Sequence, residues 1–254
     1  MEVLPISVPV KKAKFDVYES FKRSSFRFKD NDILVISSKY VSMGEGAVVS
    51  LSKIRVSTKA RLFASKYCLS AKMAELILRE SDYIFRGIPG YILSVRDGII
   101  APNAGIDRSN VPDGFAVLYP RQPFISALKI RTKFFIDASI KVGIVIADSR
   151  LMPTRIGTTG VAIAVSGFEP VEDQRGKKDL FGNVLKVTFK AVADSLATIG
   201  VAVMGESNEA QPAAAIRGLK VISTERRLTW HDIAVDSRED IYIRELKGSK
   251  SFVL

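Results

Sequence analysis

The strongest constraint on the fold is a short apolar run from Val142 to Ala147, which Asp148 follows directly. Apart from Gly143, every residue in this run is apolar, so an extended strand there would be hydrophobic on both faces. Such a strand lies inside a sheet that is covered on both sides. We therefore predict a central buried strand that ends at Asp148 and holds this carboxylate at the rim of a sheet, where ligands often bind.

Basic and glycine residues follow at the same predicted rim. Arg150 and Arg155 are followed by Gly157 and Gly160. A fixed carboxylate, arginines and glycine backbone that a ligand can approach closely suit a metal-bound phosphate. An acidic helix cap followed by an ordinary glycine turn fits the same residues, so the segment alone leaves both interpretations open.

The low counts of histidine and cysteine exclude several kinds of site. One histidine, His231, and one cysteine, Cys68, argue against a His-based metal site, a Ser-His-Asp triad and an internal disulfide. Catalysis would then rest on carboxylates, basic residues, hydroxyls and metal. A single cysteine fits a reducing cytoplasm. Because no apolar run is long enough to span a bilayer and the first residues lack a signal-peptide pattern, we expect a cytoplasmic protein with no membrane partner.

The net charge of +11 indicates anionic partners. Basic residues are spread from Lys11 to Lys250, without an aromatic-interleaved basic block or a zinc-finger spacing. A generally basic surface is the simplest interpretation, phosphorylated small substrates come second and nucleic acid third. We therefore predict no nucleic-acid partner.

Hydrophobic periodicity and turn residues predict a mixture of strands and helices, and a hydrophobic content of 47% suffices for one large domain or two smaller ones. The predicted strands are 1–11, 32–42, 83–100 (a hairpin turning at Asp97-Gly98), 115–119, 142–147 and 212–221, and the predicted helices are 15–21, 58–80, 126–139, 187–204 and 230–250. The segment SMGEG at 42–46 fits a turn and also fits glycine backbone beside a phosphate.

The segment 101–114, APNAGIDRSNVPDG, interrupts this pattern with polar residues between two apolar strands. Such a segment fits a solvated loop. It fits equally a site in which Asp107 holds a metal and Asn110 donates a hydrogen bond to a ligand.

Five motifs carry a resemblance to a known family. They are NAGIDRSNV at 103–111, IADS with PTRIGTTGVAIAVSG within 144–167, RGKKDLFGN at 175–183, VADSLA with VMGE at 192–206, and PAAAIRG at 212–218. In this order and spacing they resemble the coenzyme F420 γ-glutamyl ligase family over nearly the whole chain.

The resemblance implies both a fold and a reaction. It implies an α+β fold of mixed sheets with packed helices, in which residues 1–254 form a single ligase unit of two intertwined subdomains, and a homodimer with nucleotide near the interface. It also implies a GTP-dependent ligase that activates a carboxylate of a phosphorylated small-molecule acceptor as an acyl phosphate, which the amine of L-glutamate then displaces. Magnesium or manganese and a monovalent cation, potassium, are the implied cofactors. Phosphoryl transfer depends on charge neutralisation and positioning, so no Cys or His nucleophile is required.

Carried over position by position, the resemblance assigns individual site residues. Asp107, Asp148 and Glu206 correspond to metal ligands, with Ser149 in place of a metal-adjacent threonine. Arg155 is a candidate phosphate clamp. The corresponding nucleotide contacts are Pro9, Val10, Ser37, Ser38, Asn110 and Ser207.

Three departures from the family pattern concern the nucleotide. Met43 replaces a nucleotide-contacting lysine, and Leu151 and Met152 stand where glycine and arginine are usual. Residues 207–211, SNEAQ, replace a glycine-rich run. We therefore keep two alternatives open: the same chemistry on another acceptor such as a folate, and a non-catalytic nucleotide- or metabolite-binding relative.

Overall fold

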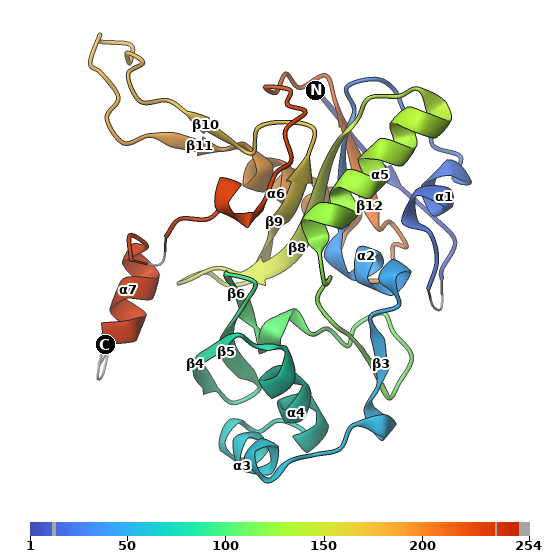
Figure 1. Ribbon diagram of the computed structural model, residues 1–254, viewed down its shortest axis with the longest axis vertical. Helices are drawn as coiled ribbons and strands as arrows, with labels where there is room; N and C mark the ends of the chain where they lie inside the picture. Colours follow the sequence, from blue (N-terminus) through green and yellow to red (C-terminus); the bar gives the residue numbers. More distant parts are fainter. Residues whose placement is uncertain (12–13, 237, 249–254) are drawn as a thin grey trace. The chain divides into compact units, whose positions relative to one another are not determined.

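The computed structural model describes residues 1–11, 14–236 and 238–248. The chain divides into two compact units, each built from more than one segment (Figure 1). The first contains Met1–Val48, Ser109–Val111 and Tyr119–Ile233, and the second contains Val49–Arg108, Pro112–Leu118 and Ala234–Leu254. Mixed sheets with packed helices confirm the predicted α+β class.

The first unit is built on a five-stranded sheet in the order β1-β12-β2-β8-β9. Its strands are β1 (Glu2–Ile6), β2 (Ile33–Ser37), β8 (Gly143–Leu151), β9 (Thr158–Ser166) and β12 (Ala213–Arg217). Strands β2 and β8 run parallel, and the other neighbours are antiparallel. Ile144, Val145 and Ile146 of β8 are fully buried, which confirms the predicted central strand.

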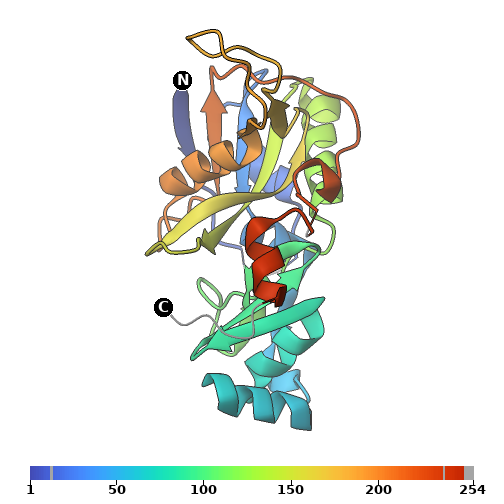
Figure 2. The ribbon, with the colours of Figure 1, turned by 90° about the vertical axis from the view of Figure 1, so that its left-hand side faces the viewer.

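Helices cover both faces of this sheet (Figure 2). Helix α6 (Val192–Met204) packs on one face, and α5 (Pro123–Ala138) packs on the other against β8 and β9. The short helices α1 (Val17–Lys22) and α2 (Ser38–Glu45) complete the unit, together with the 3₁₀ turn η3 (Trp230–Asp232) and the separate hairpin of β10 (Val171–Asp173) and β11 (Phe189–Ala191).

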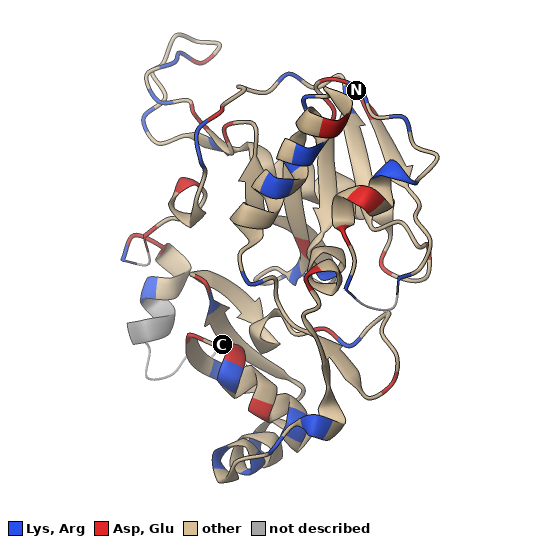
Figure 3. Cartoon of the chain, turned by 45° about the vertical axis from the view of Figure 1, so that its right-hand side comes forward, with Lys and Arg blue, Asp and Glu red and all other residues tan. Residues whose placement is uncertain are grey.

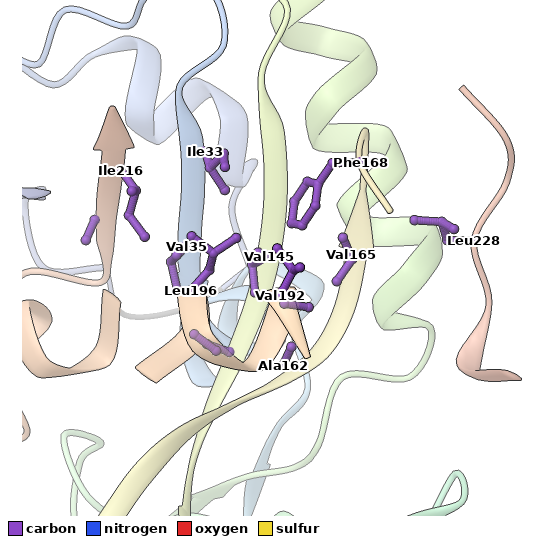
Figure 4. Close-up of a cluster of buried hydrophobic side chains, with 14 of the residues drawn as sticks. Ile33, Val35, Val145, Ala162, Val165, Phe168, Val192, Leu196, Ile216 and Leu228 are labelled. Atoms are coloured by element: carbon purple, nitrogen blue, oxygen red, sulfur yellow. The ribbon is translucent and has the colours of Figure 1, made fainter. Parts of the chain in front are cut away.

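Helix α6 can lie close to the sheet because a glycine is present on each side of the contact, one in β9 and one in the helix. A Cβ on Gly160 of β9 would lie 2.2 Å from the carbonyl oxygen of Ala197, and a Cβ on Gly200 of α6 would lie 2.5 Å from Val35 Cβ. Around them Val35, Val145, Val192 and Leu196 form the apolar core between helix and sheet (Figure 4). Gly160 is therefore covered by the helix, whereas the sequence interpretation gave it a role in ligand approach.

Several predicted boundaries were wrong. Strand β8 continues through Asp148 to Leu151, because residues 148–151 pair with 158–161 of β9. Strand β2 ends at Ser37, and the following SKYVSMGE forms helix α2, which Gly46 ends in the left-handed conformation (φ 78°). Helix α6 begins at Val192, since β11 occupies the preceding residues.

The second unit combines two helices with small antiparallel sheets. Helices α3 (Thr58–Tyr67) and α4 (Ala71–Glu80) replace the single predicted helix, since left-handed Cys68 (φ 52°) ends the first and the Ser70 side chain caps the second. Strands β4 (Tyr83–Ile88), β5 (Tyr91–Arg96) and β6 (Ile99–Pro102) form one sheet, with Asp97-Gly98 at the predicted turn. A second small sheet pairs β3 (Val48–Ser50) with β7 (Phe115–Val117). The remaining elements are the 3₁₀ turns η1 (Leu51–Lys53) and η2 (Asn103–Gly105) and helix α7 (Ile241–Gly248).

Glu75 of α4 joins the two helices of this unit. Its carboxylate accepts hydrogen bonds from Ser57 N (2.9 Å), Ser57 Oγ (2.6 Å) and Arg79 Nε (2.7 Å). The bonds from Ser57, followed by the bond from Arg79, lower the pKa of Glu75 from 4.5 to about 2.

We expect Glu75→Gln to lower the free energy of unfolding at pH 7 and to lose this effect in acid. A carboxylate whose pKa is lowered by folding stabilises the protein fully above its unfolded pKa, and the stabilisation disappears as the pH falls from 4.5 toward 2. Urea midpoints of the two proteins should therefore differ at pH 7 and converge near the lower pKa. A difference that is independent of pH would contradict this.

Lys and Arg residues are distributed along elements of both units (Figure 3). Within the described residues, no helix has the length and apolar character needed to cross a membrane.

Candidate functional site

Four pairs of consecutive residues from the first unit are joined by hydrogen bonds into a closed ring. The pairs are Ser38-Lys39, Ser109-Asn110, Asp148-Ser149 and Glu206-Ser207. Each pair is bonded to the next: 38 to 148, 149 to 206, 207 to 110, and 109 to 39. Segments that are distant in sequence therefore converge on one site, which we call the polar ring.

The first part of the polar ring joins α2 to β8. Ser38 Oγ donates to Asp148 Oδ1 at 2.9 Å, and Arg150 Nε donates to the other carboxylate oxygen at 3.0 Å. Asp148 and Arg150 share one face of the strand, since they are two residues apart. The Arg150 side chain is only 6% exposed, and the Asp148 side chain is 22% exposed. Asp148 is thus a fixed carboxylate that still reaches solvent.

The second part joins the opposite face of β8 to the end of α6. Ser149 Oγ donates to Glu206 Oε1 at 2.5 Å, and Thr158 Oγ1 lies 3.4 Å from the same oxygen. Because successive strand residues point to opposite faces, Asp148 and Ser149 extend to different sides of β8. The two predicted metal carboxylates therefore flank one strand.

The third part joins two loops. Asn110, which is left-handed (φ 53°), donates from Nδ2 to the carbonyl oxygen of Ser207 at 2.8 Å. Next to it, Lys39 Nζ donates to Ser109 Oγ at 2.6 Å. Ser109 was not assigned to the site from the sequence, and its only signal was that it adjoins Asn110, which has an assigned role.

The carboxylate of Glu209 bonds back to the loop after α6, to which it belongs. Glu209 accepts a hydrogen bond from Ser207 N at 2.8 Å. Its carboxylate lies against Gly205, where a Cβ would be 2.4 Å from Glu209 Cδ. Gly205 also has a positive φ of 77°, which favours glycine at this position. A negative charge therefore occupies the loop in which the family pattern has glycines.

Five predicted site residues lie outside the polar ring, and four of them belong to the first unit. Ser37 precedes α2, and its backbone N–H donates to Pro212 O at 2.9 Å. Pro9 and Val10 are exposed, directly after Val8, whose N–H bonds to Ala210 O at 3.4 Å. Arg155 lies in the exposed turn between β8 and β9.

Asp107 belongs to the second unit. There its backbone N–H and carbonyl oxygen pair with Val117 at 3.0 and 2.8 Å. Its predicted role as a metal ligand stays a prediction, as do those of Asp148, Ser149 and Glu206.

The donor chemistry of the polar ring fits a hard divalent cation. Asp148 and Glu206 supply carboxylate oxygens, and Ser38 and Ser149 supply hydroxyls, which are the ligand types that magnesium and manganese prefer. Among the described residues, no group of three or more His, Cys, Asp or Glu side chains is close enough to hold a metal. A bound ion would therefore need hydroxyl, water or phosphate oxygens in addition to these carboxylates.

Comparison with known proteins defines the class. A family model described as F420-0:Gamma-glutamyl ligase matches residues 9–218, which include the whole polar ring. The coenzyme F420:L-glutamate ligase of Methanopyrus kandleri is 36% identical over 221 residues, covering 87% of this chain and 88% of that protein. The ligase of the same name from Archaeoglobus fulgidus is 34% identical over 248 residues, covering 97% of this chain and 98% of that protein.

A third relative, the coenzyme F420:L-glutamate ligase of Methanothermobacter thermautotrophicus, is 40% identical over 190 residues, covering 74% of this chain and 75% of that protein. The protein is thus a ligase of the class that forms amide bonds with glutamate. It belongs to the F420-0:gamma-glutamyl ligase family, which confirms the resemblance found in the sequence motifs.

Proposed function

We propose that the protein is a GTP-dependent ligase that adds L-glutamate in γ-linkage to a coenzyme F420 precursor through an acyl-phosphate intermediate. The polar ring is the observation that carries this proposal. It joins residues that were assigned separately to metal and to nucleotide: Ser38, Asn110, Asp148, Ser149, Glu206 and Ser207. Family membership supports the ligase activity, and the meeting of these residues in one place supports a nucleotide-driven mechanism.

In this reaction a carboxylate oxygen of the acceptor attacks the γ-phosphorus of GTP, and GDP leaves. The amine of L-glutamate then attacks the acyl carbon, phosphate leaves with the carbon–oxygen bond pair, and the amine loses a proton. Asp148, Ser149 and Glu206 would hold magnesium or manganese, and a potassium ion would serve as the monovalent cofactor. Asp107 is carried over separately as a candidate ligand from the family resemblance. A bound divalent ion would neutralise phosphate charge.

The remaining residues would orient the nucleotide. Arg150 fixes one oxygen of Asp148, so the carboxylate is held before any ligand arrives. Asn110 would contact the nucleotide, and its side-chain amide donates to Ser207 O in the loop after α6. Ser37 bonds to Pro212 after this loop, and Val8, which precedes Pro9 and Val10, bonds to Ala210 within it. Arg155, from an exposed turn, is the candidate phosphate clamp.

Phosphate release from GTP tests this function. We expect release only when both L-glutamate and the deazaflavin acceptor are present, together with a mass increase of the acceptor by one or more glutamyl residues. Phosphate release with another acceptor, such as a folate, would show that the protein catalyses the same reaction on a different substrate. No release with any acceptor would leave a non-catalytic nucleotide- or metabolite-binding protein.

We also propose a cytoplasmic homodimer. The β10–β11 hairpin exposes Leu180 and Phe181 at 101% and 90%, and exposed side chains of this size are typical of interaction surfaces. Sedimentation at micromolar concentration should give twice the chain mass of 27.9 kDa, with or without GTP. A monomer under both conditions would contradict the homodimer.

The carboxylate of Glu209 provides a test of nucleotide affinity. We expect Glu209→Gln to bind GTP with manganese about tenfold more tightly. The Glu209 carboxylate accepts a hydrogen bond from Ser207 N, and its negative charge would repel a phosphate that approaches this N–H group. Calorimetry should show a gain of the same sign for Met43→Lys, which restores the cation of the family pattern.

Glu172→Gln is the matched control, since Glu172 lies in β10 and pairs with Lys190 at 3.8 Å. If the native protein already binds GTP tightly and selectively, and neither variant changes this, the glycine-poor loop does not weaken the nucleotide site.

A further inference from the structure

Helix α6 is fastened to strand β9 by two polar side chains in addition to its apolar core. Asp194 Oδ1 accepts a hydrogen bond from Ala162 N at 2.8 Å. One helical turn later, Thr198 Oγ1 donates to Gly160 O at 2.8 Å. Both bonds are made to backbone atoms of the strand, so they fix where the helix lies along β9 whatever the strand side chains are.

These two contacts bracket the strand residue that pairs with Asp148. Val161 of β9 is the partner of Asp148, and Gly160 is the partner of Ser149. The register of the two strands shifts just before this point, where Ile146 pairs with Ala164 and Ala147 with Ala162. An irregularity of this kind re-aims the residues that follow it. The N–H of Ala162, at the shift, is the group that Asp194 holds.

The far end of the same helix carries the candidate ligand. After Met204 the chain turns at Gly205, and Glu206 accepts a hydrogen bond from Ser149 of β8. Side-chain hydrogen bonds therefore join the β8–β9 pair to three points along this segment: Asp194 near the start of the helix, Thr198 in its middle and Glu206 beyond its end. Apolar packing alone is not directional, and small glycine and alanine surfaces permit sliding, whereas hydrogen bonds to backbone atoms do not.

We propose that Asp194 and Thr198 are positioning residues that set the placement of α6 along β9 and so hold Glu206 beside Ser149 in the polar ring. The inference rests on the proposed function for the role of Glu206 as a metal ligand. Misplacing a ligand by about 1 Å is enough to impair a site, and loss of residues that orient metal ligands typically weakens metal binding by about 10–100-fold.

Thr198 allows a clean test because two conservative variants separate its hydroxyl from its shape. Thr198→Val keeps the shape and removes the donor, whereas Thr198→Ser keeps the donor and removes a methyl group. Ser195→Ala is the matched control, because Ser195 is exposed on the same helix and its hydroxyl donates to the carbonyl oxygen of Ala191, the N-cap residue of that helix (2.8 Å). Asp194→Asn keeps an acceptor oxygen, and Asp194→Ala removes it.

Manganese binding to the folded protein, measured from the electron paramagnetic resonance signal of the free ion, is the first measurement. We expect Thr198→Val and Asp194→Ala to raise the manganese Kd by about tenfold, and Thr198→Ser, Asp194→Asn and Ser195→Ala to stay within about twofold of wild type. Adding Thr198→Val to Glu206→Gln should weaken binding no further, since Thr198 acts through Glu206. Wild-type affinity in Thr198→Val would overturn the proposal.

A metal-free measurement separates this proposal from the assignment of Glu206 as a ligand. In a Cys68→Ser background, Ser149→Cys and Glu206→Cys can be bridged by a short thiol crosslinker such as dibromobimane. We expect Thr198→Val to slow this crosslinking severalfold and Thr198→Ser to leave it unchanged. If Glu206→Gln does not alter manganese affinity, the ligand assignment fails, and the crosslinking rates still decide whether Thr198 positions the end of α6. Equal rates in the Val and Ser variants would overturn the proposal.

Discussion

Asp148→Asn is expected to reduce the rate of ligation by at least about a hundredfold and to weaken manganese binding in parallel. The substitution keeps the shape of the side chain and removes the charge that a hard divalent ion requires. The amide oxygen of the introduced asparagine can still accept from Arg150, and its Nδ2 group can donate to the Ser38 hydroxyl, so the local geometry is retained. Arg150, at 6% exposed, loses its anionic partner, and we therefore expect a moderate fall in Tm as well.

Asp32→Asn is the matched control for this variant. Asp32 is fully buried and accepts two hydrogen bonds of 2.8 Å from Arg217, so its replacement also breaks a carboxylate–arginine pair in the first unit. Asp32 lies outside the polar ring, and its variant should lose stability while the folded protein keeps manganese affinity.

Asp107→Asn should reduce ligation and manganese binding in the same way as Asp148→Asn. If both retain the wild-type rate at limiting metal, neither residue is a ligand.

The sequence predicted the parts of the fold that repeat a strong local pattern. The run Val142–Ala147 is buried on both sides, as its composition indicated, and the Asp97-Gly98 turn lies where its residue types favour it. Helix α2 was missed because its first residues were predicted to continue the strand as far as residue 42, and its glycine, which is atypical of a helix interior, was assigned to a turn. Its helical state depends on packing against β2 and β8, which no local pattern reveals.

The site residues were predicted from the family motifs, and their mutual arrangement was not. Nothing in the sequence indicated that Asp148 lies inside a strand, because the pairing of 148–151 with 158–161 is a tertiary property of the hairpin. Because both residues lie in β8, the side chains of Asp148 and Ser149 point to opposite faces of the sheet. The bond from Arg150 to Asp148 was not indicated by the motif either, and a role of Arg150 toward phosphate stays a prediction.

Gly160 shows how a glycine can be interpreted in two ways from sequence. Within TRIGTTGVA it suggested backbone that a ligand approaches, and in the structure the close neighbour is the backbone of α6. The same absence of a side chain serves either purpose. Only the position of helix α6, whose Val192 and Leu196 pack in the core over the sheet, decides between them.

Gly160→Ala is accordingly expected to destabilise the protein by about 3 kcal/mol, at the upper end of the usual cost of overpacking. The added methyl group would lie 2.2 Å from Ala197 O, 2.5 Å from Ala197 C and 2.8 Å from Thr198 N. All three are backbone atoms, so no side-chain rotation relieves the contact, and α6 must move away from β9. Urea unfolding monitored by circular dichroism should show the loss as a lower midpoint with an unchanged slope.

Two further variants identify the cause of that loss. Gly157→Ala lies in the same hairpin, where a Cβ meets nothing within 4 Å but φ is +94°, so its cost reports backbone strain without a clash. Ala197→Gly combined with Gly160→Ala should restore nothing, because the contact is with the carbonyl group of Ala197 and not with its methyl group. A Gly160→Ala protein as stable as wild type, or one rescued by Ala197→Gly, would show that the backbone of α6 is not what covers Gly160. Since the same shift would pull Thr198 from Gly160 O and Glu206 from Ser149, the variant that remains folded should also bind manganese more weakly than Gly157→Ala does.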